Sequence, residues 1–167
     1  MGSGGHCKEM SHCIAGFPKE FKLSYFLVAR QDYLTIQKIA EVMEKRLEKY
    51  EIIEIIRARK VKQSYFTSII TTTLSLMECF FVFLKIKPDI LICNGPGTCI
   101  PPAIICYLMQ KLKLIKSFPI VFIESICRVK TLSLSGKILY FVADLFIVQW
   151  LELKKNYQNA NYIGRLI

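Results

Sequence analysis

Asn94-Gly-Pro-Gly-Thr-Cys-Ile-Pro101 is the stretch that decides the fold of this chain. It follows an apolar run at residues 88–93 that is typical of a buried parallel strand, and it precedes a helical stretch that opens with Pro101 and Pro102. A strand, a glycine turn and a helix start point backbone N–H groups and a positive helix end at an anion. Glycine turns at such places also arise for steric reasons alone, and no Gly-Lys-Ser/Thr of a Walker loop follows this one.

A second glycine turn, Gly2-Ser-Gly-Gly-His6, opens the chain. It is not a complete dinucleotide-binding fingerprint, because the third glycine of that spacing is missing. Two glycine loops in one small α/β domain nevertheless predict a phosphorylated ligand, in particular a diphosphate.

Strand-like and helix-like segments alternate along the chain. Apolar, aromatic and β-branched runs predict strands at residues 21–28, 51–56, 88–93, 118–124, 145–150 and 162–167. Helical spacing and caps predict helices at residues 32–50, 64–85, 102–114 and 135–144. The alternation predicts one α/β domain over residues 1–167, with a parallel sheet and helices on both of its faces.

Five groups of residues follow predicted strands or open the chain, and all fall at the edge where open parallel sheets bind ligands. They are His6 with its turn, Arg30, residues 57–62, residues 94–98 and residues 124–128. The Glu124 carboxylate and the His6 imidazole suit acid–base chemistry at such a site. Each has a structural alternative, a loop imidazole without chemistry or a buried, helix-capping carboxylate.

The charge of the chain indicates which kinds of molecule it binds, and its cysteine content indicates the compartment that it faces. The chain has 23 Lys and Arg against 13 Asp and Glu, a net charge of +10 that favours polyanions or an anionic membrane face. No nucleic-acid-binding signature is present, so we expect no nucleic acid partner. Seven cysteines without a Cys-x-x-Cys pair, most of them in apolar runs, predict reduced core residues and a cytosol-facing protein. The grouping of His6, Cys7, His12 and Cys13 matches no common zinc spacing, and no metal is expected.

One segment resembles a membrane span. Residues 66–84 carry a single charge, Glu78, but include six Thr or Ser. A spanning helix needs about 20 predominantly apolar residues, and a charge within it is costly. The segment favours a packed helix that dips one face into a membrane surface, with a spanning helix as the alternative.

Taken in order, the motifs of this chain resemble those of one family. The motifs are Gly2 to His6 with Glu9 and Met10, Asn94 to Pro101, Glu124 and Ser125, Arg128 to Lys137, Ala143 and Asp144, Gln149 and Trp150, and Tyr162 to Leu166. They are similar to the membrane-anchor subunit of the eukaryotic UDP-N-acetylglucosamine transferase of the dolichol pathway, and the match runs almost end to end.

That resemblance implies a split glycosyltransferase of the two-domain GT-B type. This chain would be its Rossmann-like, amino-terminal and acceptor-side half, and a separate catalytic subunit would bring the sugar-nucleotide site. Such a pair adds the second GlcNAc to GlcNAc-diphosphate-dolichol on the cytosolic face of the endoplasmic reticulum membrane. The chain alone would be inactive, and no cofactor is implied.

Site residues follow from the same resemblance. It assigns the acceptor diphosphate to Gly4, Gly5, Asn94, Gly95, Gly97 and Thr98. His6 would act as general base on the acceptor hydroxyl or bind phosphate, and Glu124 is the alternative base. The interface with the catalytic subunit would include Tyr162, Ile163, Gly164, Arg165, Leu166 and Ile167. A short apolar strand at a chain end would otherwise fray.

One departure from the family bears on the fold. Members carry an apolar anchor and a first strand before the glycine turn, whereas Met1 abuts the turn here. We therefore expect the sheet to lack its first strand, so that strands 21–28 and 88–93 each have an unpaired edge. A non-catalytic membrane scaffold is the alternative function. A stand-alone nucleotide-sugar enzyme is disfavoured, because 167 residues provide no second lobe to close over a donor.

Overall fold

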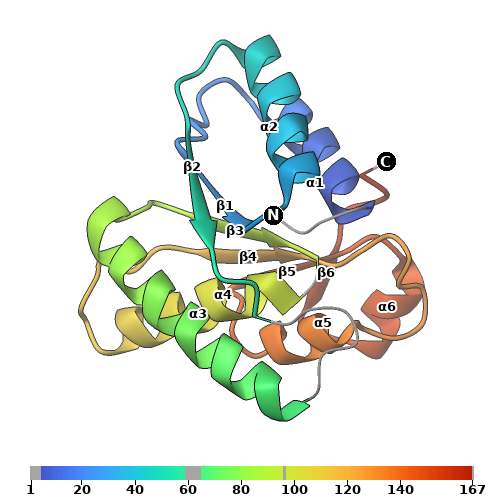
Figure 1. Ribbon diagram of the computed structural model, residues 1–167. Coiled ribbons are helices and arrows are strands. Elements are labelled where there is room, and N and C mark those ends of the chain that lie inside the picture. Colours follow the sequence, from blue (N-terminus) through green and yellow to red (C-terminus); the bar gives the residue numbers. More distant parts are fainter. Residues whose placement is uncertain (1–4, 59–64, 96, 167) are drawn as a thin grey trace.

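The computed structural model describes residues 5–58, 65–95 and 97–166, without the side chains of residues 65–67 (Figure 1). The strands are β1 (Tyr25–Ala29), β2 (Glu51–Ile55), β3 (Leu91–Asn94), β4 (Ile120–Ile123), β5 (Leu145–Val148) and β6 (Ala160–Tyr162). The α-helices are α1 (Gly5–Gly16), α2 (Tyr33–Arg46), α3 (Tyr65–Ile86), α4 (Ile100–Lys111), α5 (Leu134–Leu139) and α6 (Leu151–Asn156). A 3₁₀ turn, η1 (Gly97–Cys99), lies between β3 and α4.

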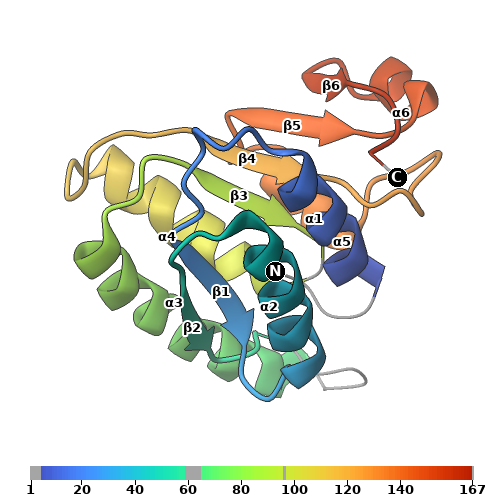
Figure 2. The ribbon, with the colours of Figure 1, turned by 90° about the horizontal axis from the view of Figure 1, so that it is seen from above.

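All strand pairs are parallel, in the orders β1-β2 and β3-β4-β5-β6. Helices α1 and α2 cover one face of the strands, and α3, α4 and α5 cover the other (Figures 1 and 2). This confirms the predicted α/β class with helices on both faces. It is the architecture of a Rossmann-like half of a GT-B fold.

The central strands are covered on both sides because their side chains alternate between two apolar clusters. On β4, Ile120 and Phe122 belong to the cluster that includes residues of α3, α4 and α5. Val121 and Ile123 belong to the cluster that includes residues of α1 and α2. A strand buried on both faces needs an unbroken apolar run, which is the pattern that the sequence shows there.

The carboxyl end of the chain differs from the prediction. A strand was predicted over residues 162–167, but β6 ends at Tyr162 and no regular structure follows through residue 166. Gly164 has a φ of 90°, a left-handed conformation that interrupts an extended strand. Arg165 lies over the Trp150 ring, 4.1 Å from its centroid, and the tail therefore turns back onto the domain.

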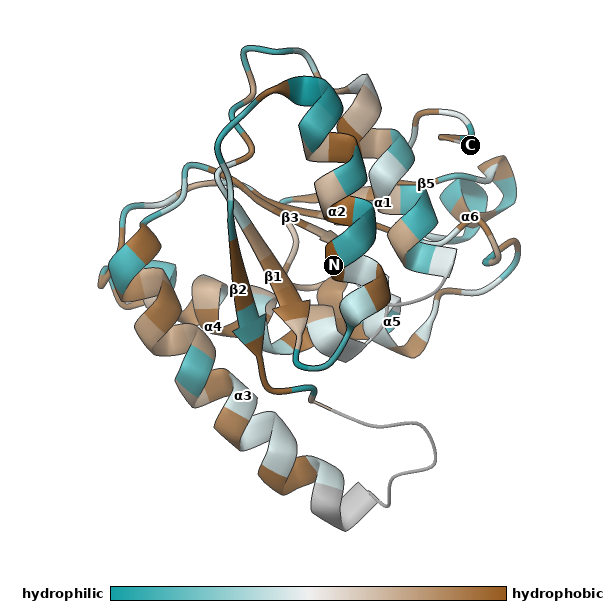
Figure 3. Ribbon diagram, turned by 45° about the horizontal axis from the view of Figure 1, so that its top comes forward, coloured by the Kyte–Doolittle hydropathy of each residue, from teal (hydrophilic) through white to brown (hydrophobic). Residues whose placement is uncertain are grey.

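Helix α3 has one packed face and one exposed face. It packs against α4, and Ser75, Cys79 and Phe83 are fully buried. The exposed apolar face consists of Ile69, Ile70, Leu74, Met77, Phe81 and Leu84. Figure 3 shows the predominance of hydrophobic residues along this helix. By length and composition the stretch Ser68–Ile86 could cross a membrane, and only 17% of it is buried.

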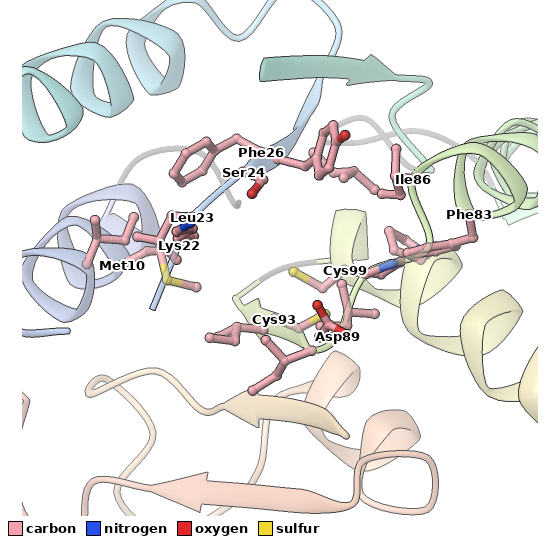
Figure 4. A pocket seen from close by; sticks show the side chains of 18 of the residues that line it. Met10, Lys22, Leu23, Ser24, Phe26, Phe83, Ile86, Asp89, Cys93 and Cys99 are labelled. Atoms are coloured by element: carbon pink, nitrogen blue, oxygen red, sulfur yellow. The ribbon is translucent and has the colours of Figure 1, made fainter. Parts of the chain in front are cut away.

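Strands β1 and β3 lie at the facing edges of the two sheets and do not pair with each other. A cavity of about 360 Å³ separates them (Figure 4). Its walls are largely apolar and include Phe26 of β1, Ile92 of β3, and Phe83 and Ile86 of α3. The two unpaired edges are those that the sequence predicted, at strands 21–28 and 88–93.

Six of the seven cysteines are buried, as expected of reduced core residues. Cys127 is the exception, because it lies exposed in the segment after β4 rather than in the core.

Candidate functional site

The carboxyl ends of the strands bring together three segments that are distant in sequence. The first turns of α1, the end of β3 and the segment after β4 meet there, and all three are joined by the carboxylate of Glu9. His6, residues 94–98 and residues 124–128 were predicted at this edge, and the structure brings these three groups together.

The predicted cations of this edge are engaged elsewhere. Arg30 pairs with Glu78 of α3, and Glu78 also accepts from the Ile56 N–H at 2.6 Å. Arg57 lies 3.8 Å from the carboxylate of Asp32, the N-cap of α2. Residues 59–62 lie outside the described residues, as does Gly4.

His6 lies in the first turn of α1, against the backbone of Gly95. Gly95 has a φ of 100°, in the left-handed region that favours glycine. A Cβ added to Gly95 would lie 2.5 Å from Cγ of His6, so any larger residue would displace the ring. The His6 side chain keeps 29% of its surface exposed, and the imidazole is therefore held in place yet accessible.

Glu9 lies one turn after His6 and is almost fully buried. Its carboxylate accepts from Asn94 Nδ2 at 3.1 Å, Ser125 Oγ at 2.8 Å and the Ile126 N–H at 3.1 Å. Oε2 also lies 3.5 Å from Nδ1 of His6, which has no hydrogen-bond partner among the described residues. Burial alone would raise the pKa of Glu9, but its polar partners outweigh burial and lower that pKa to about 2.

Asn94 and the loop after it differ in accessibility. The Asn94 side chain is fully buried and donates to Glu9, so it supports the site from beneath. Gly97 and Thr98 are half-buried in η1, which leads into α4. Pro101 and Pro102 carry no N–H in the first turn of α4, so that turn has fewer backbone donors to offer than an ordinary helix start. Among the described residues, the amides of η1 and of the first turn of α1 are backbone donors that an anion could use.

Glu124 is buried in a separate set of hydrogen bonds. It accepts from the Ser125 N–H, the Ser133 N–H and the Ser133 hydroxyl, each at 3.0 Å. Ser133 is the N-cap of α5 and accepts from the Gly136 N–H at 2.9 Å. A Cβ at Gly136 would lie 2.1 Å from a Glu124 oxygen. This geometry matches the helix-capping alternative, and nothing in it directs the Glu124 carboxylate toward His6.

The carboxyl-terminal tail reaches the same edge. Gln149 donates to the Glu124 carbonyl at 3.0 Å and accepts from the Leu166 N–H at 3.1 Å. The Trp150 indole donates to the Ile126 carbonyl at 2.6 Å and stacks with Arg165. Tyr162 and Ile163 are exposed, at 43% and 56%, whereas Ile167 lies outside the described residues. The tail thus exposes apolar side chains, while its backbone is hydrogen-bonded to Gln149 beside the site.

Glu9 and Ser125 are the site residues to which the sequence analysis gave no role. Both stand within motifs that it quoted, but the helix α1 was not predicted. A helix starting at Gly5 places residues 6 and 9 on one face, because residues three apart are neighbours. That spacing was the signal that could have paired Glu9 with His6.

Comparison with known proteins gives one consistent result. The family model described as "Oligosaccharide biosynthesis protein Alg14 like" matches residues 1–166. The chain is 39% identical over 175 residues to a mouse protein and 38% over 174 residues to a human one, covering 99% of this chain and 80% of each relative. A Saccharomyces cerevisiae protein is 35% identical over 178 residues, covering 100% of this chain and 75% of the relative.

All three relatives carry the name UDP-N-acetylglucosamine transferase subunit ALG14. The matched residues include the start of α1, the loop after β3 and the tail that returns to the site. The chain therefore belongs to the Alg14-like family of oligosaccharide biosynthesis proteins.

Proposed function

We propose that this chain is the acceptor-side subunit of a UDP-N-acetylglucosamine transferase that elongates GlcNAc-diphosphate-dolichol. The observation that carries the proposal is the His6 imidazole, clamped between Gly95 and Glu9 at the carboxyl edge of a parallel sheet. The names of its relatives support the sugar and the nucleotide. A catalytic partner subunit is proposed to supply the donor site, because the relatives are named as one subunit of a transferase.

The proposed chemistry assigns His6 as the general base. Nδ1 faces Glu9, so Nε2 is the nitrogen free to take the proton of the acceptor hydroxyl. The acceptor oxygen then forms its bond to C1 of the donor GlcNAc, and the bond from C1 to the nucleotide diphosphate breaks with UDP leaving. Glu124 is the less suitable base, because its carboxylate is buried among three donors around the start of α5.

The acceptor diphosphate is proposed to lie between the start of α1 and the loop after β3. Gly5, Gly95, Gly97 and Thr98 supply backbone groups there, and Asn94 supports the loop through its hydrogen bond with Glu9. Gly4, which precedes Gly5 in the sequence, is proposed to contribute as well. Helix α1 has 12 residues, and the positive end of its dipole favours an anion at Gly5.

The membrane and the partner are proposed to occupy different surfaces. The exposed apolar face of α3 suits the acyl region of an endoplasmic reticulum membrane on its cytosolic side. The tail from Tyr162 to Ile167 is proposed to contact the catalytic subunit, because its exposed apolar residues stand beside the site.

The alternative is a scaffold that binds membrane and partner without taking part in the chemistry. One observation favours it: the carboxylates of Glu9 and Glu124 are both buried and engaged in hydrogen bonds, so that neither is available as a base beside His6.

His6→Gln in the reconstituted two-subunit complex distinguishes the two functions. His12→Gln is the matched control, because His12 is an exposed histidine of the same helix. General-base catalysis is worth about 10²–10⁴-fold, so kcat should fall by that factor in the first variant only. An unchanged kcat for His6→Gln in an intact complex would establish the scaffold and overturn the catalytic proposal.

A further inference from the structure

The Glu9 carboxylate connects the three segments that meet at the carboxyl ends of the strands. It belongs to α1, it binds the side chain that ends β3, and it binds both the hydroxyl and a backbone amide of the segment after β4. Burial of an ionised carboxylate costs desolvation free energy unless hydrogen bonds offset it, and three donors offset it for Glu9. Glu9 therefore stays ionised inside the protein, one helical turn from the imidazole.

The ionised state of Glu9 matters because its carboxylate faces the imidazole of His6. Oε2 of Glu9 lies 3.5 Å from the buried Nδ1 of His6. An ionised carboxylate accepts hydrogen bonds and cannot donate one, so it favours the imidazole tautomer that carries its proton on Nδ1. Nε2 then keeps its lone pair. The present distance exceeds that of a good N–H···O bond by about half an ångström, and such contacts tighten when substrate binds.

We propose that Glu9 is a positioning residue, which fixes the tautomer and orientation of His6 and couples that ring to the loop after β3. This proposal rests on the proposed role of His6 as base. Glu9 itself touches no substrate, because it is buried beneath the imidazole. The coupling runs through Asn94, whose amide binds Glu9 and whose backbone precedes the glycine that packs on His6.

Two titratable groups face the imidazole among the described residues. Glu9 lies on the Nδ1 side. Cys99 of η1 is the second, and its hydrogen bond with Cys93 lowers its pKa to about 7. Cys99→Ser therefore controls for any contribution of this thiol to the effect of a Glu9 variant.

The test is a double-mutant cycle in the assembled transferase, with UDP-GlcNAc and a short-chain lipid diphosphate-GlcNAc as substrates. Glu9→Gln should lower kcat by about 10- to 100-fold with a smaller change in KM. In a His6→Gln background the same change should cost less than about 3-fold, because the group through which Glu9 acts is gone. Equal losses in both backgrounds would refute the proposal.

Glu48→Gln is the matched structural control. Glu48 also accepts from an arginine and a backbone N–H, at the far end of α2. A comparable fall in kcat with Glu48→Gln would assign the Glu9 effect to general instability. If His6→Gln leaves kcat unchanged, the proposed function fails first and the role of Glu9 fails with it.

A spectroscopic measurement does not depend on activity or on the stability of the variant. The chain contains two histidines, so ¹⁵N-histidine labelling within the complex gives two imidazole spectra, and His12→Gln identifies His6. At pH 8 we expect His6 as the Nδ1–H tautomer. A wild-type His6 that carries its proton on Nε2 would overturn the assignment of Glu9 as the group that positions it.

Discussion

At the scale of single residues, the site depends on two glycines with different constraints. Gly95 combines a φ of 100° with the closest approach to His6, whereas an added Cβ on Gly97 would meet nothing within 4 Å. The glycine pair that the sequence singled out as one motif therefore contains one residue required by geometry and one that is tolerant.

Gly95→Ala should lower kcat of the complex by about 100-fold and also reduce stability. The new Cβ pushes the His6 ring aside, and a non-glycine residue at this φ costs of order 1–3 kcal/mol. Gly16→Ala, at the far end of α1 where an added Cβ meets nothing within 4 Å, is the matched control and should retain nearly all activity. Steady-state kinetics and thermal midpoints of both variants check this, and similar effects at the two positions would contradict it.

Because folding lowers the pKa of Glu9, the free energy of unfolding depends on pH in the acidic range. The group has an ordinary pKa of 4.5 and a folded-state pKa of about 2, so its contribution is complete above pH 4.5 and is lost as the pH falls toward 2. The shift corresponds to roughly 3 kcal/mol. Denaturant titrations at several pH values should show Glu9→Gln losing less stability than wild type between pH 5 and 2. Parallel pH dependence in the two proteins would disprove it.

At the scale of elements, periodicity predicted strands β1 to β5 and helices α2 to α5, but neither α1 nor α6. Residues 51–56, 118–124 and 145–150 were predicted as strands and contain β2, β4 and β5. Helix α1 was missed because its glycine-rich start was interpreted only as a turn, although its buried residues 7, 10 and 14 have helical spacing. Because α1 was missed, the pairing of Glu9 with His6 on one face of that helix was missed as well. Burial of Glu124 depends on packing against α5, and no local pattern could choose between its catalytic and capping roles.

The exposed face of α3 should bind membranes. Met77→Gln with Phe81→Gln removes two large apolar side chains, exposed by 57% and 64%, and should abolish flotation with vesicles that contain anionic lipid. Thr73→Gln changes an already polar, exposed position of the same helix and should float as wild type does. Binding should also weaken with salt because the chain has a charge of +10. Flotation of the double variant at wild-type levels would rule out this face.

The carboxyl-terminal tail should hold the partner subunit. Deleting residues 163–167 removes the exposed Ile163 and the Arg165 that anchors the tail to Trp150. Co-purification with the catalytic subunit should be lost while the domain remains folded, since the tail adds no strand to the sheet. Lys154→Ala, on the adjacent α6, is the control. Retention of the partner by the truncated chain would exclude the tail from the interface.

At the scale of the whole molecule, the division into two parallel sheets is the main feature of the architecture. Among the described strands, β1 pairs with β2 alone and β3 with β4 alone, and their other edges face the cavity of about 360 Å³. Its walls belong to both apolar clusters, so the cavity interrupts the core. Helix α1 begins at Gly5 beside the end of β3, so a chain segment placed before that helix and parallel to β3 would enter the site from the cavity.

We therefore expect an amino-terminal extension of six to ten apolar, β-branched residues to stabilise the domain. Such a segment spans about 20–33 Å as a strand and would give β1 and β3 the backbone partners that their edges lack. It would also fix the start of α1, and with it His6. The thermal midpoint should rise by at least about 5 °C, and amides of β1 and β3 should gain protection from hydrogen exchange. An extension of equal length with proline at two interior positions is the control, because proline cannot donate to a strand neighbour on either side. If the two extensions stabilise the chain equally, or neither protects β1 and β3, the cavity does not accept a strand.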